Sequence, residues 1–273
     1  IDFRSVVVQI VSHDETSFLG RVLSGGEVGS NKGVSCDRSI PLPPFTQKDK
    51  DAFVLARDLG ISCFALSFAS SKEDVMQLRS FFPYEVVVIS KIESKKGLEN
   101  LEEICEVSDA VLIDRGDLSR EIPLSKIAFA QKSIIERARK VSTPVYVATN
   151  LLESMVDDCR PTRAEINDIT STILDGAEGL VLAAETAIGK YPVQSVRMVS
   201  SIAQEVQNYK ESAHITDYLA LSPTGDLIAP HGGVLVQNFM DEGAIDPREN
   251  LPEVEVDEKI FSDIVQIAEG TYS

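Results

Sequence analysis

The stretch VVISKIESKKGLENLEEI, residues 87–104, joins a run of β-branched residues to a segment with helical spacing. In a strand, residues i and i+2 point to the same face, so Lys91 and Glu93 leave the end of this run together. Such a pair is either a simple ion pair at the end of a strand or part of a site. Taken alone, an ion pair at the rim of the fold is the commoner case. The rest of the sequence helps to decide whether the pair is a simple ion pair or part of a site.

The pattern of a short apolar run followed by a helical segment recurs along the chain. Apolar runs occupy residues 61–68, 86–92, 110–113, 144–149 and 179–183. Helical spacing and capping signals predict helices over about residues 47–59, 70–82, 98–106, 124–141, 163–175 and 192–210. Thr46 and Ser71 are candidate N-caps, and Thr162 and Glu165 have the spacing of a capping box.

Strands that alternate with helices in this way predict an α/β fold with a parallel sheet. The number and spacing of the runs favour part of a TIM (β/α)₈ barrel, about five βα units, over an open doubly wound sheet. In a barrel, the chemistry lies at the C-terminal ends of the strands.

Residues 41–212 carry this alternation of apolar runs and helical segments. The two ends of the chain do not. Residues 1–40 contain FRSVVVQIV and SFLGRVLSGG, which predict short antiparallel strands joined at glycines. Residues 213–273 contain 12 acidic and 2 basic residues, and Gly and Pro reappear there. We expect this segment to be a linker and the beginning of another domain. Because the first residue is Ile1, we also expect the chain to be a fragment of a longer protein.

The composition excludes some classes of function. The chain has 26 basic and 43 acidic residues, a net charge of −17, which argues against nucleic acid and anionic membranes as partners. No apolar run has the length of a membrane span, and no signal peptide is present. The four cysteines lack metal-ligand spacing, which indicates reduced thiols and predicts a cytoplasmic protein.

Polar residues that could carry chemistry follow the apolar runs: Lys91, Glu93, Asp114, Arg115, Asp117, Thr149 and Glu185. We expect Glu93 and Asp117 to end successive strands, and two carboxylates with water suit Mg²⁺. Gly116 allows the backbone to approach a ligand, and the amides of Gly116 and Asp117 in a short turn could bind an anion. Thr149 adds a hydroxyl and Lys91 a positive charge. Such a set suits stabilisation of a phosphoryl group or an enolate.

Six segments, in the family's order, resemble pyruvate kinase: GSNKGV (29–34), ISKIE (89–93), RGDL (115–118), PVYVATNLLESM (144–155), RPTRAE (160–165) and ILDGAEGLVLAAETAIGKYP (173–192). The resemblance covers about residues 1–210. It implies a barrel of that type, with residues 1–40 as the end of a small β domain. It also implies a glycolytic kinase that converts phosphoenolpyruvate and ADP to pyruvate and ATP with Mg²⁺ and K⁺.

Roles carried over from the resemblance fall on the same strand ends. Glu93 and Asp117 would hold Mg²⁺, and Lys91 and Thr149 would be catalytic. Lys91, the amides of Gly116 and Asp117, and the hydroxyl of Thr149 would bind the substrate, and Lys32 would reach the nucleotide phosphates. The K⁺ ligands would lie upstream of Ile1. A homo-oligomer is left open.

The chain departs from the family's pattern at several positions. The usual Ala-Arg-Gly-Asp reads Asp114-Arg115-Gly116-Asp117, which adds a carboxylate beside the site. The usual Thr-Gln is Thr149-Asn150, and the usual Ser-Gly-Glu-Thr begins with Ala183-Ala184. These changes support an alternative, a catalytically degenerate scaffold or ligand-binding module derived from pyruvate kinase.

A second resemblance lies near the C-terminus. LIAPHGGVLVQN (227–238) and LPEVEVDEKIFSDIVQIAEGTYS (251–273) resemble the beginning of ATP sulfurylase (sulfate adenylyltransferase). It implies a fused sulfurylase module and a bifunctional protein, and it reaches no catalytic motif of that enzyme. A further hypothesis is that sulfate activation is the main activity of the intact protein.

Overall fold

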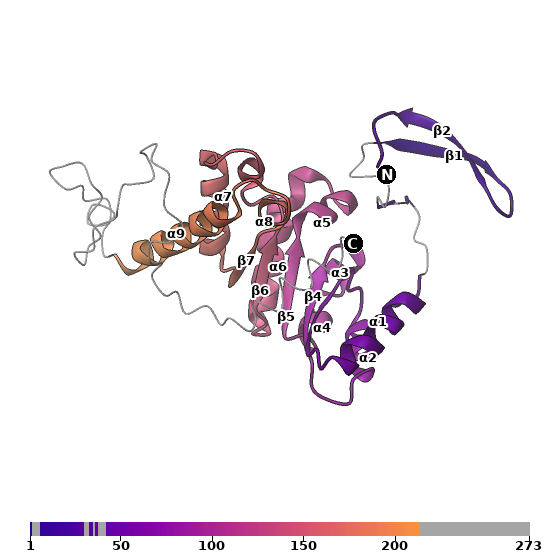
Figure 1. Ribbon diagram of the computed structural model, residues 1–273, viewed down its shortest axis with the longest axis horizontal. Coiled ribbons are helices and arrows are strands. Elements are labelled where there is room, and N and C mark those ends of the chain that lie inside the picture. The colour runs from indigo at the N-terminus through magenta and orange to yellow at the C-terminus, as the bar shows by residue number, and fades with distance from the viewer. Residues whose placement is uncertain (2–5, 30–32, 35, 38–41, 213–273) are drawn as a thin grey trace. The chain divides into compact units, whose positions relative to one another are not determined.

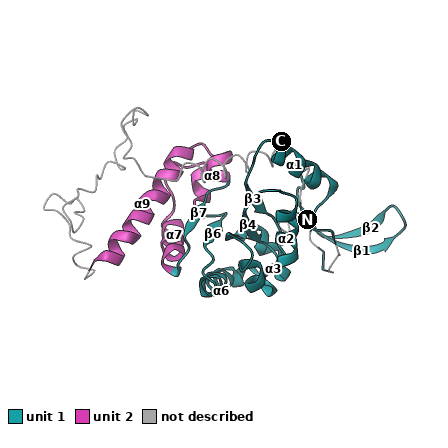
Figure 2. Ribbon diagram, turned by 90° about the horizontal axis from the view of Figure 1, so that it is seen from below, with its two compact units in different colours: residues 1–151, 175–183 teal, residues 152–174, 184–273 magenta. Residues whose placement is uncertain are grey.

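The computed structural model describes residues 1, 6–29, 33–34, 36–37 and 42–212. The chain divides into two compact units, coloured in Figure 2. The first unit is Ile1–Leu151 with Asp175–Ala183, and the second is Leu152–Leu174 with Ala184–Ser273. Lys32 and the whole sulfurylase-like segment, residues 213–273, lie outside the described residues.

An antiparallel hairpin of β1 (Val7–His13) and β2 (Phe18–Ser24) confirms the strands predicted near the N-terminus. In its turn, Asp14 Oδ1 accepts hydrogen bonds from the amides of Thr16 and Ser17, both at 2.8 Å. These bonds to the charged form lower the pKa of Asp14 to about 2. The Asp14 carboxylate therefore holds the turn closed at neutral pH.

Five parallel strands form the sheet of the first unit, in the order in which they occur in the chain: β3 (Cys63–Leu66), β4 (Val87–Ile92), β5 (Ala110–Asp114), β6 (Val145–Ala148) and β7 (Gly179–Val181) (Figure 1). All five predicted strands are confirmed. The unreversed order is that of a barrel wall, whereas a doubly wound sheet reverses its order. No closed barrel is seen in the described part of the chain, and the fold is consistent with a portion of one.

The first unit has one helix before β3, α1 (Gln47–Asp58). Its other described helices follow β3, β4 and β5: α2 (Lys72–Ser80), α3 (Lys95–Glu99), α4 (Leu101–Cys105), α5 (Arg115–Glu121), η1 (Leu124–Lys126) and α6 (Ile127–Lys140). Thr46 and Ser71 are confirmed as N-caps, and each forms a capping box with an aspartate. The predicted helix over 98–106 is wrong in its extent, because α3 and α4 meet at Asn100. The Asn100 side chain donates to the carbonyl of Ser70 at 2.8 Å, which fixes this break.

The two faces of the sheet differ. Side chains of one face, among them Val88, Val111 and Val147, are fully buried and pack into one core with residues of the helices. The other face carries Ile89 and Leu112, which are also buried but lie outside that core. By strand alternation and register, Lys91 and Asp114 share this second face with them. A sheet buried on both faces is what a barrel wall requires.

The second unit contains η2 (Glu153–Val156), most of α7 (Arg163–Asp175), α8 (Ala184–Ala187) and α9 (Pro192–Glu211). The capping box predicted at the start of α7 is confirmed. Thr162 Oγ1 accepts from the amide of Glu165 at 3.2 Å, and the amide of Thr162 donates to Glu165 Oε2 at 2.7 Å. Glu165 also accepts from the amide and the hydroxyl of Ser154 at 2.8 and 2.6 Å. Among the described residues, no helix combines the length and the apolar character needed to cross a membrane.

The Glu165 carboxylate should make the stability of the protein depend on pH. Burial alone would raise its pKa, but the hydrogen bonds from Ser154 and Thr162 outweigh burial and lower it. Stabilisation is therefore present above the unfolded-state pKa of about 4.5 and is lost as the pH falls through the lower folded-state pKa. We expect Glu165→Gln to reduce the free energy of unfolding by about 1 kcal/mol at pH 7.

Urea unfolding at a series of pH values between 3 and 7 measures this effect. The difference between Glu165→Gln and the unsubstituted protein should shrink as the pH falls below about 4.5. Asp158→Asn removes an exposed carboxylate from the same unit and should have little effect at any of these pH values. A Glu165→Gln loss that stays constant down to pH 3 would contradict the assignment.

Candidate active site at the ends of β4, β5 and β6

The Lys91–Glu93 pair lies at the C-terminal end of β4 and is largely buried. Lys91 Nζ is 2.8 Å from Glu93 Oε1, as their spacing in the strand predicts, and the Glu93 side chain is 1% exposed. Glu93 Oε2 accepts a hydrogen bond from the amide of Phe68 at 2.6 Å. Oε1 is buried and accepts no aligned hydrogen bond, although the ammonium is within ion-pair distance. This burial sets the pair apart from ordinary surface ion pairs.

The carboxylate that ends β5 is Asp114, and the prediction that Asp117 ends this strand is wrong. Instead of a short turn, the helix α5 begins at Arg115, so Asp117 lies in its first turn. The Asp114 side chain is the N-cap of α5, because its Oδ1 accepts from the amide of Asp117 at 3.3 Å. Carboxylate oxygens of Glu93, Asp114 and Asp117 nevertheless lie within 4.8 Å of one another. The two predicted metal ligands are thus brought together with a third carboxylate.

Burial and neighbouring charges shift the pKa values of Lys91 and Glu93. Burial alone would lower the pKa of Lys91, but Glu93 and Asp114, whose Oδ2 is 3.4 Å from Nζ, raise it overall. Burial raises the pKa of Glu93, and Lys91 and the Phe68 amide offset this only in part. The ammonium therefore stays charged. Three carboxylates stand against two cations in the cluster, Lys91 and Arg120, the second of which pairs with Asp117. A bound cation would relieve this imbalance.

Thr149 and Asn150 follow β6 with φ angles of 67° and 54°, a conformation uncommon for a β-branched residue such as threonine. Arg115 holds this backbone. Its Nε and Nη2 donate to the Thr149 carbonyl at 3.0 and 2.8 Å, and Nη2 also donates to the Asn150 carbonyl at 2.8 Å. The Thr149 hydroxyl accepts from the amide of Gly116 at 2.8 Å. Its single proton faces two acceptors, the Ala148 carbonyl at 2.6 Å and Asp114 Oδ1 at 3.2 Å. The structure thus brings Thr149 and Gly116 to the carboxylate cluster.

Two further contacts in the cluster were not predicted from the sequence. Phe68 turns its amide towards Glu93 with a positive φ of 52°, which no residue pattern signals. Arg120, one turn after Asp117 on α5, forms an ion pair with the Asp117 carboxylate. The i,i+3 spacing of these two residues could have indicated this pair if α5 had been expected.

Two residues named from the sequence are not part of this cluster as described. Glu185 lies in α8 of the second unit, where its Oε1 accepts from the amide of Leu152 at 2.9 Å. Lys32 lies outside the described residues, so its prediction as a nucleotide ligand stays a prediction.

The fold and the cluster define a class: a parallel α/β protein with a lysine and three carboxylates at the ends of its strands. The pyruvate kinase barrel-domain family matches residues 1–196. The chain is 38% identical to a pyruvate kinase of Thermotoga maritima over 217 residues, which cover 78% of this chain and 47% of that protein. It is 40% identical to a pyruvate kinase of Agaricus bisporus over 204 residues, 73% of this chain and 38% of that protein. A pyruvate kinase of Mycobacterium tuberculosis, strain H37Rv, is 38% identical over 213 residues, 77% and 45% of the two chains.

The chain therefore belongs to the pyruvate kinase family through its barrel domain. The pyruvate kinase resemblance seen in its motifs is confirmed. The chain spans somewhat less than half the length of these three relatives.

Removal of the Lys91 charge should destabilise the protein. In Lys91→Met the buried Glu93 carboxylate would lose its ion pair while Asp114 remains close by. Breaking a buried pair in this way should reduce the free energy of unfolding by about 3 kcal/mol at pH 7. Lys95→Met, which removes an exposed lysine from α3, should change it by less than about 0.5 kcal/mol. Urea unfolding of both variants measures the difference, and equal stabilities would show that the pair contributes nothing.

Proposed function

We propose that the chain contributes to an active site that transfers a phosphoryl group from phosphoenolpyruvate to ADP, giving pyruvate and ATP, with Mg²⁺ and K⁺. The observation that carries this proposal is the Lys91 ammonium set among three clustered carboxylates, in a chain of the pyruvate kinase family. A cation beside a group of oxygen ligands is what phosphoryl transfer requires, because negative charge develops on the oxygens of the transferred group and its partners.

The residues present fit Mg²⁺. Carboxylate oxygens are hard ligands, and three carboxylates lie within 4.8 Å of one another here. Glu93 Oε1 is held only by its ion pair with Lys91, whereas Oε2 accepts from the Phe68 amide, so Oε1 is the oxygen open to a metal ion. In this proposal Glu93 and Asp117 hold the ion, which when bound neutralises charge on the phosphoryl oxygens. Arg120, now paired with Asp117, would have to move aside. K⁺ is proposed as the second ion, as the family resemblance implies.

The remaining roles follow from charge and position. Lys91 keeps its proton, because the carboxylates raise its pKa, and it would stabilise the transferring phosphoryl group and the enolate oxygen. The amides of Gly116 and Asp117 and the hydroxyl of Thr149 would bind the substrate carboxylate. Lys91 and Thr149 are the proposed catalytic residues. Lys32 is proposed to contact the nucleotide phosphates.

The proposed organisation follows the family. Residues 1–40 would be the end of a small β domain and residues 41–212 a portion of the barrel. The family match ends at residue 196, and the sulfurylase-like segment lies beyond it. A fused sulfate adenylyltransferase therefore stays a prediction, which an assay of adenylyl transfer from ATP to sulfate by the intact protein would test. A cytoplasmic location and the oligomeric state also stay predictions.

A second candidate function is a ligand-binding module without turnover. It is favoured by the contacts of Asp114, which engages groups assigned above to the substrate. Binding of phosphoenolpyruvate without transfer to ADP by the intact protein would support this alternative.

Substitution of the two proposed metal ligands tests the proposed metal site directly. We expect Glu93→Gln and Asp117→Asn each to weaken Mn²⁺ binding by about 100-fold or more, because each replaces a charged ligand with a neutral one. Mg²⁺-dependent binding of phosphoenolpyruvate should be lost in both variants. Mn²⁺ binding is measured by electron paramagnetic resonance, and phosphoenolpyruvate binding by calorimetry with and without Mg²⁺ and K⁺.

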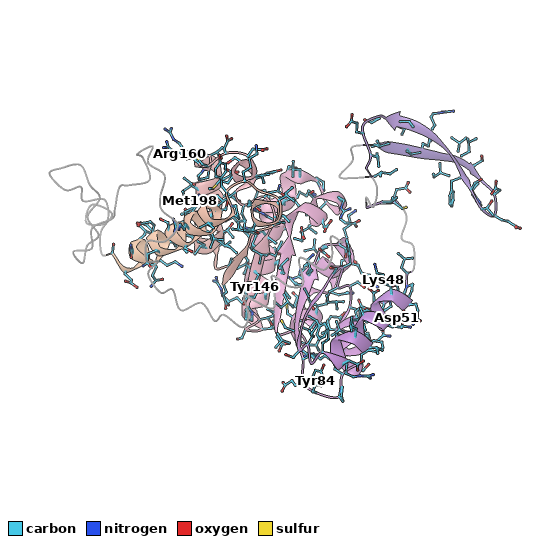
Figure 3. The ribbon with its side chains drawn as sticks, viewed as in Figure 1. Lys48, Asp51, Tyr84, Tyr146, Arg160 and Met198 are labelled. Carbon is cyan, nitrogen blue, oxygen red and sulfur yellow. The ribbon has the colours of Figure 1, made fainter. Side chains whose placement is uncertain are left out.

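Matched controls remove exposed carboxylates of the same two kinds. Glu99→Gln changes α3, and Asp51→Asn changes α1, where Asp51 is labelled in Figure 3. Both controls should bind Mn²⁺ as the unsubstituted protein does. Unchanged binding in Glu93→Gln and Asp117→Asn would rule out the proposed metal site.

A further inference from the structure

The Asp114 carboxylate contacts two groups that the proposed function assigns to the substrate carboxylate, the Asp117 amide and the Thr149 hydroxyl. It also contacts the Lys91 ammonium, which that proposal assigns to the phosphoryl group and the enolate oxygen. Its Oδ1 accepts from the amide of Asp117 at 3.3 Å and lies 3.2 Å from the hydroxyl of Thr149. Its Oδ2 lies 3.4 Å from the ammonium of Lys91. The amide in the first turn of α5, the hydroxyl after β6 and the ammonium of β4 thus lie around one carboxylate. That carboxylate belongs to the chain itself.

The geometry of these contacts indicates that Asp114 fills this position imperfectly. All three distances are longer than the roughly 2.7–3.0 Å typical of hydrogen bonds to a carboxylate. Two of the donors also have closer partners: the Thr149 hydroxyl lies 2.6 Å from the Ala148 carbonyl, and the Lys91 ammonium lies 2.8 Å from Glu93 Oε1. A small carboxylate that is not attached to the backbone could approach each donor more closely. A ligand carboxylate could contact the Asp117 amide only if the Asp114 side chain left its present position.

At position 114 this chain has aspartate, whereas the pyruvate kinase pattern that it resembles has alanine. An alanine at position 114, as in that pattern, would bring no carboxylate to the Asp117 amide or the Thr149 hydroxyl, while Lys91 would keep its ion pair with Glu93. With Asp114 in place, the Asp117 amide and the Thr149 hydroxyl already contact a side chain of the protein.

We propose that Asp114 is an internal occupant of the anion position, so that this chain selects against ligands that place a carboxylate there. The inference rests on the proposed function for the identity of the ligand, phosphoenolpyruvate. The occupied position itself rests only on the contacts of Asp114. The two can therefore be tested separately.

Formate is the probe for the occupied position, because it is a carboxylate without a side chain. Asp114→Ala removes one carboxylate group and leaves a space of the same shape. We expect formate to bind Asp114→Ala at least tenfold more tightly than the unsubstituted protein. Binding is measured in the 273-residue protein by nuclear magnetic resonance, through the shift of the Asp117 amide as formate is added. Formate affinity in Asp114→Ala no greater than in the unsubstituted protein would overturn the inference.

Two further variants separate occupancy from charge. Asp114→Asn keeps the size of the side chain and an oxygen for the Asp117 amide but removes the charge, so it should gain little formate affinity. An equal gain in Asp114→Asn and Asp114→Ala would overturn the idea that Asp114 acts by filling the position. Glu136→Ala removes an exposed carboxylate on α6, which pairs with Lys140, and should leave formate affinity unchanged.

Loss of the cap of α5 could prevent Asp114→Ala from folding. Asp114→Ser then carries the test, because its hydroxyl can still cap the Asp117 amide while the carboxylate is gone. It should gain formate affinity through Lys91 and Thr149, and a folded Asp114→Ser without any gain would overturn the inference.

Phosphoenolpyruvate with Mg²⁺ then separates this inference from the proposed function. If Asp114→Ala gains affinity for both formate and phosphoenolpyruvate, both proposals are supported. A gain for formate alone would support the internal occupant and count against phosphoenolpyruvate as the substrate. Equal Mg²⁺-dependent binding of phosphoenolpyruvate by Asp114→Ala and the unsubstituted protein, with no gain for formate, would overturn the inference and leave the proposed function standing.

Discussion

Burial of the Glu93 carboxylate at the end of β4 is the constraint on which the rest of the site depends. An isolated buried carboxylate is costly, so Lys91 and the amide of Phe68 must lie where they partner it. The Lys91 ammonium in turn draws in Asp114 from the next strand. Asp114 then caps α5 and sets the position of Asp117. One buried charge thereby organises the ends of β3, β4 and β5.

Local sequence signals predicted most of the secondary structure because those signals act over a few residues. The β-branched run ending at Ile92 can only bury its side chains as a strand, and Thr46 and Ser71 supply caps within three residues. The break at Asn100 was missed because its cause is distant in the sequence, a hydrogen bond to the carbonyl of Ser70. Helix α5 was missed because Gly116 favours a turn on propensity alone.

The members of the site were predicted better than their contacts. Strand alternation was sufficient to place Lys91 and Glu93 together, and the ends of neighbouring parallel strands bring in Asp114 and Thr149. Positive φ angles at Phe68 and Thr149 could not be predicted, because tertiary contacts impose them. Without these angles the Phe68 amide would not face Glu93, nor the Thr149 hydroxyl the amide of Gly116.

The same contacts relate stability to binding at this site. In many binding sites the hydrogen-bond donors have no protein partner when the ligand is absent. Such unsatisfied donors destabilise the unliganded protein. Here the Asp117 amide and the Lys91 ammonium already contact Asp114, and the Gly116 amide already contacts Thr149. A site satisfied by its own side chains is more stable when empty, and a ligand must displace those contacts to bind. The aspartate at position 114 therefore stabilises the empty fold at the expense of affinity for an anion, whichever of the two proposed functions the protein performs.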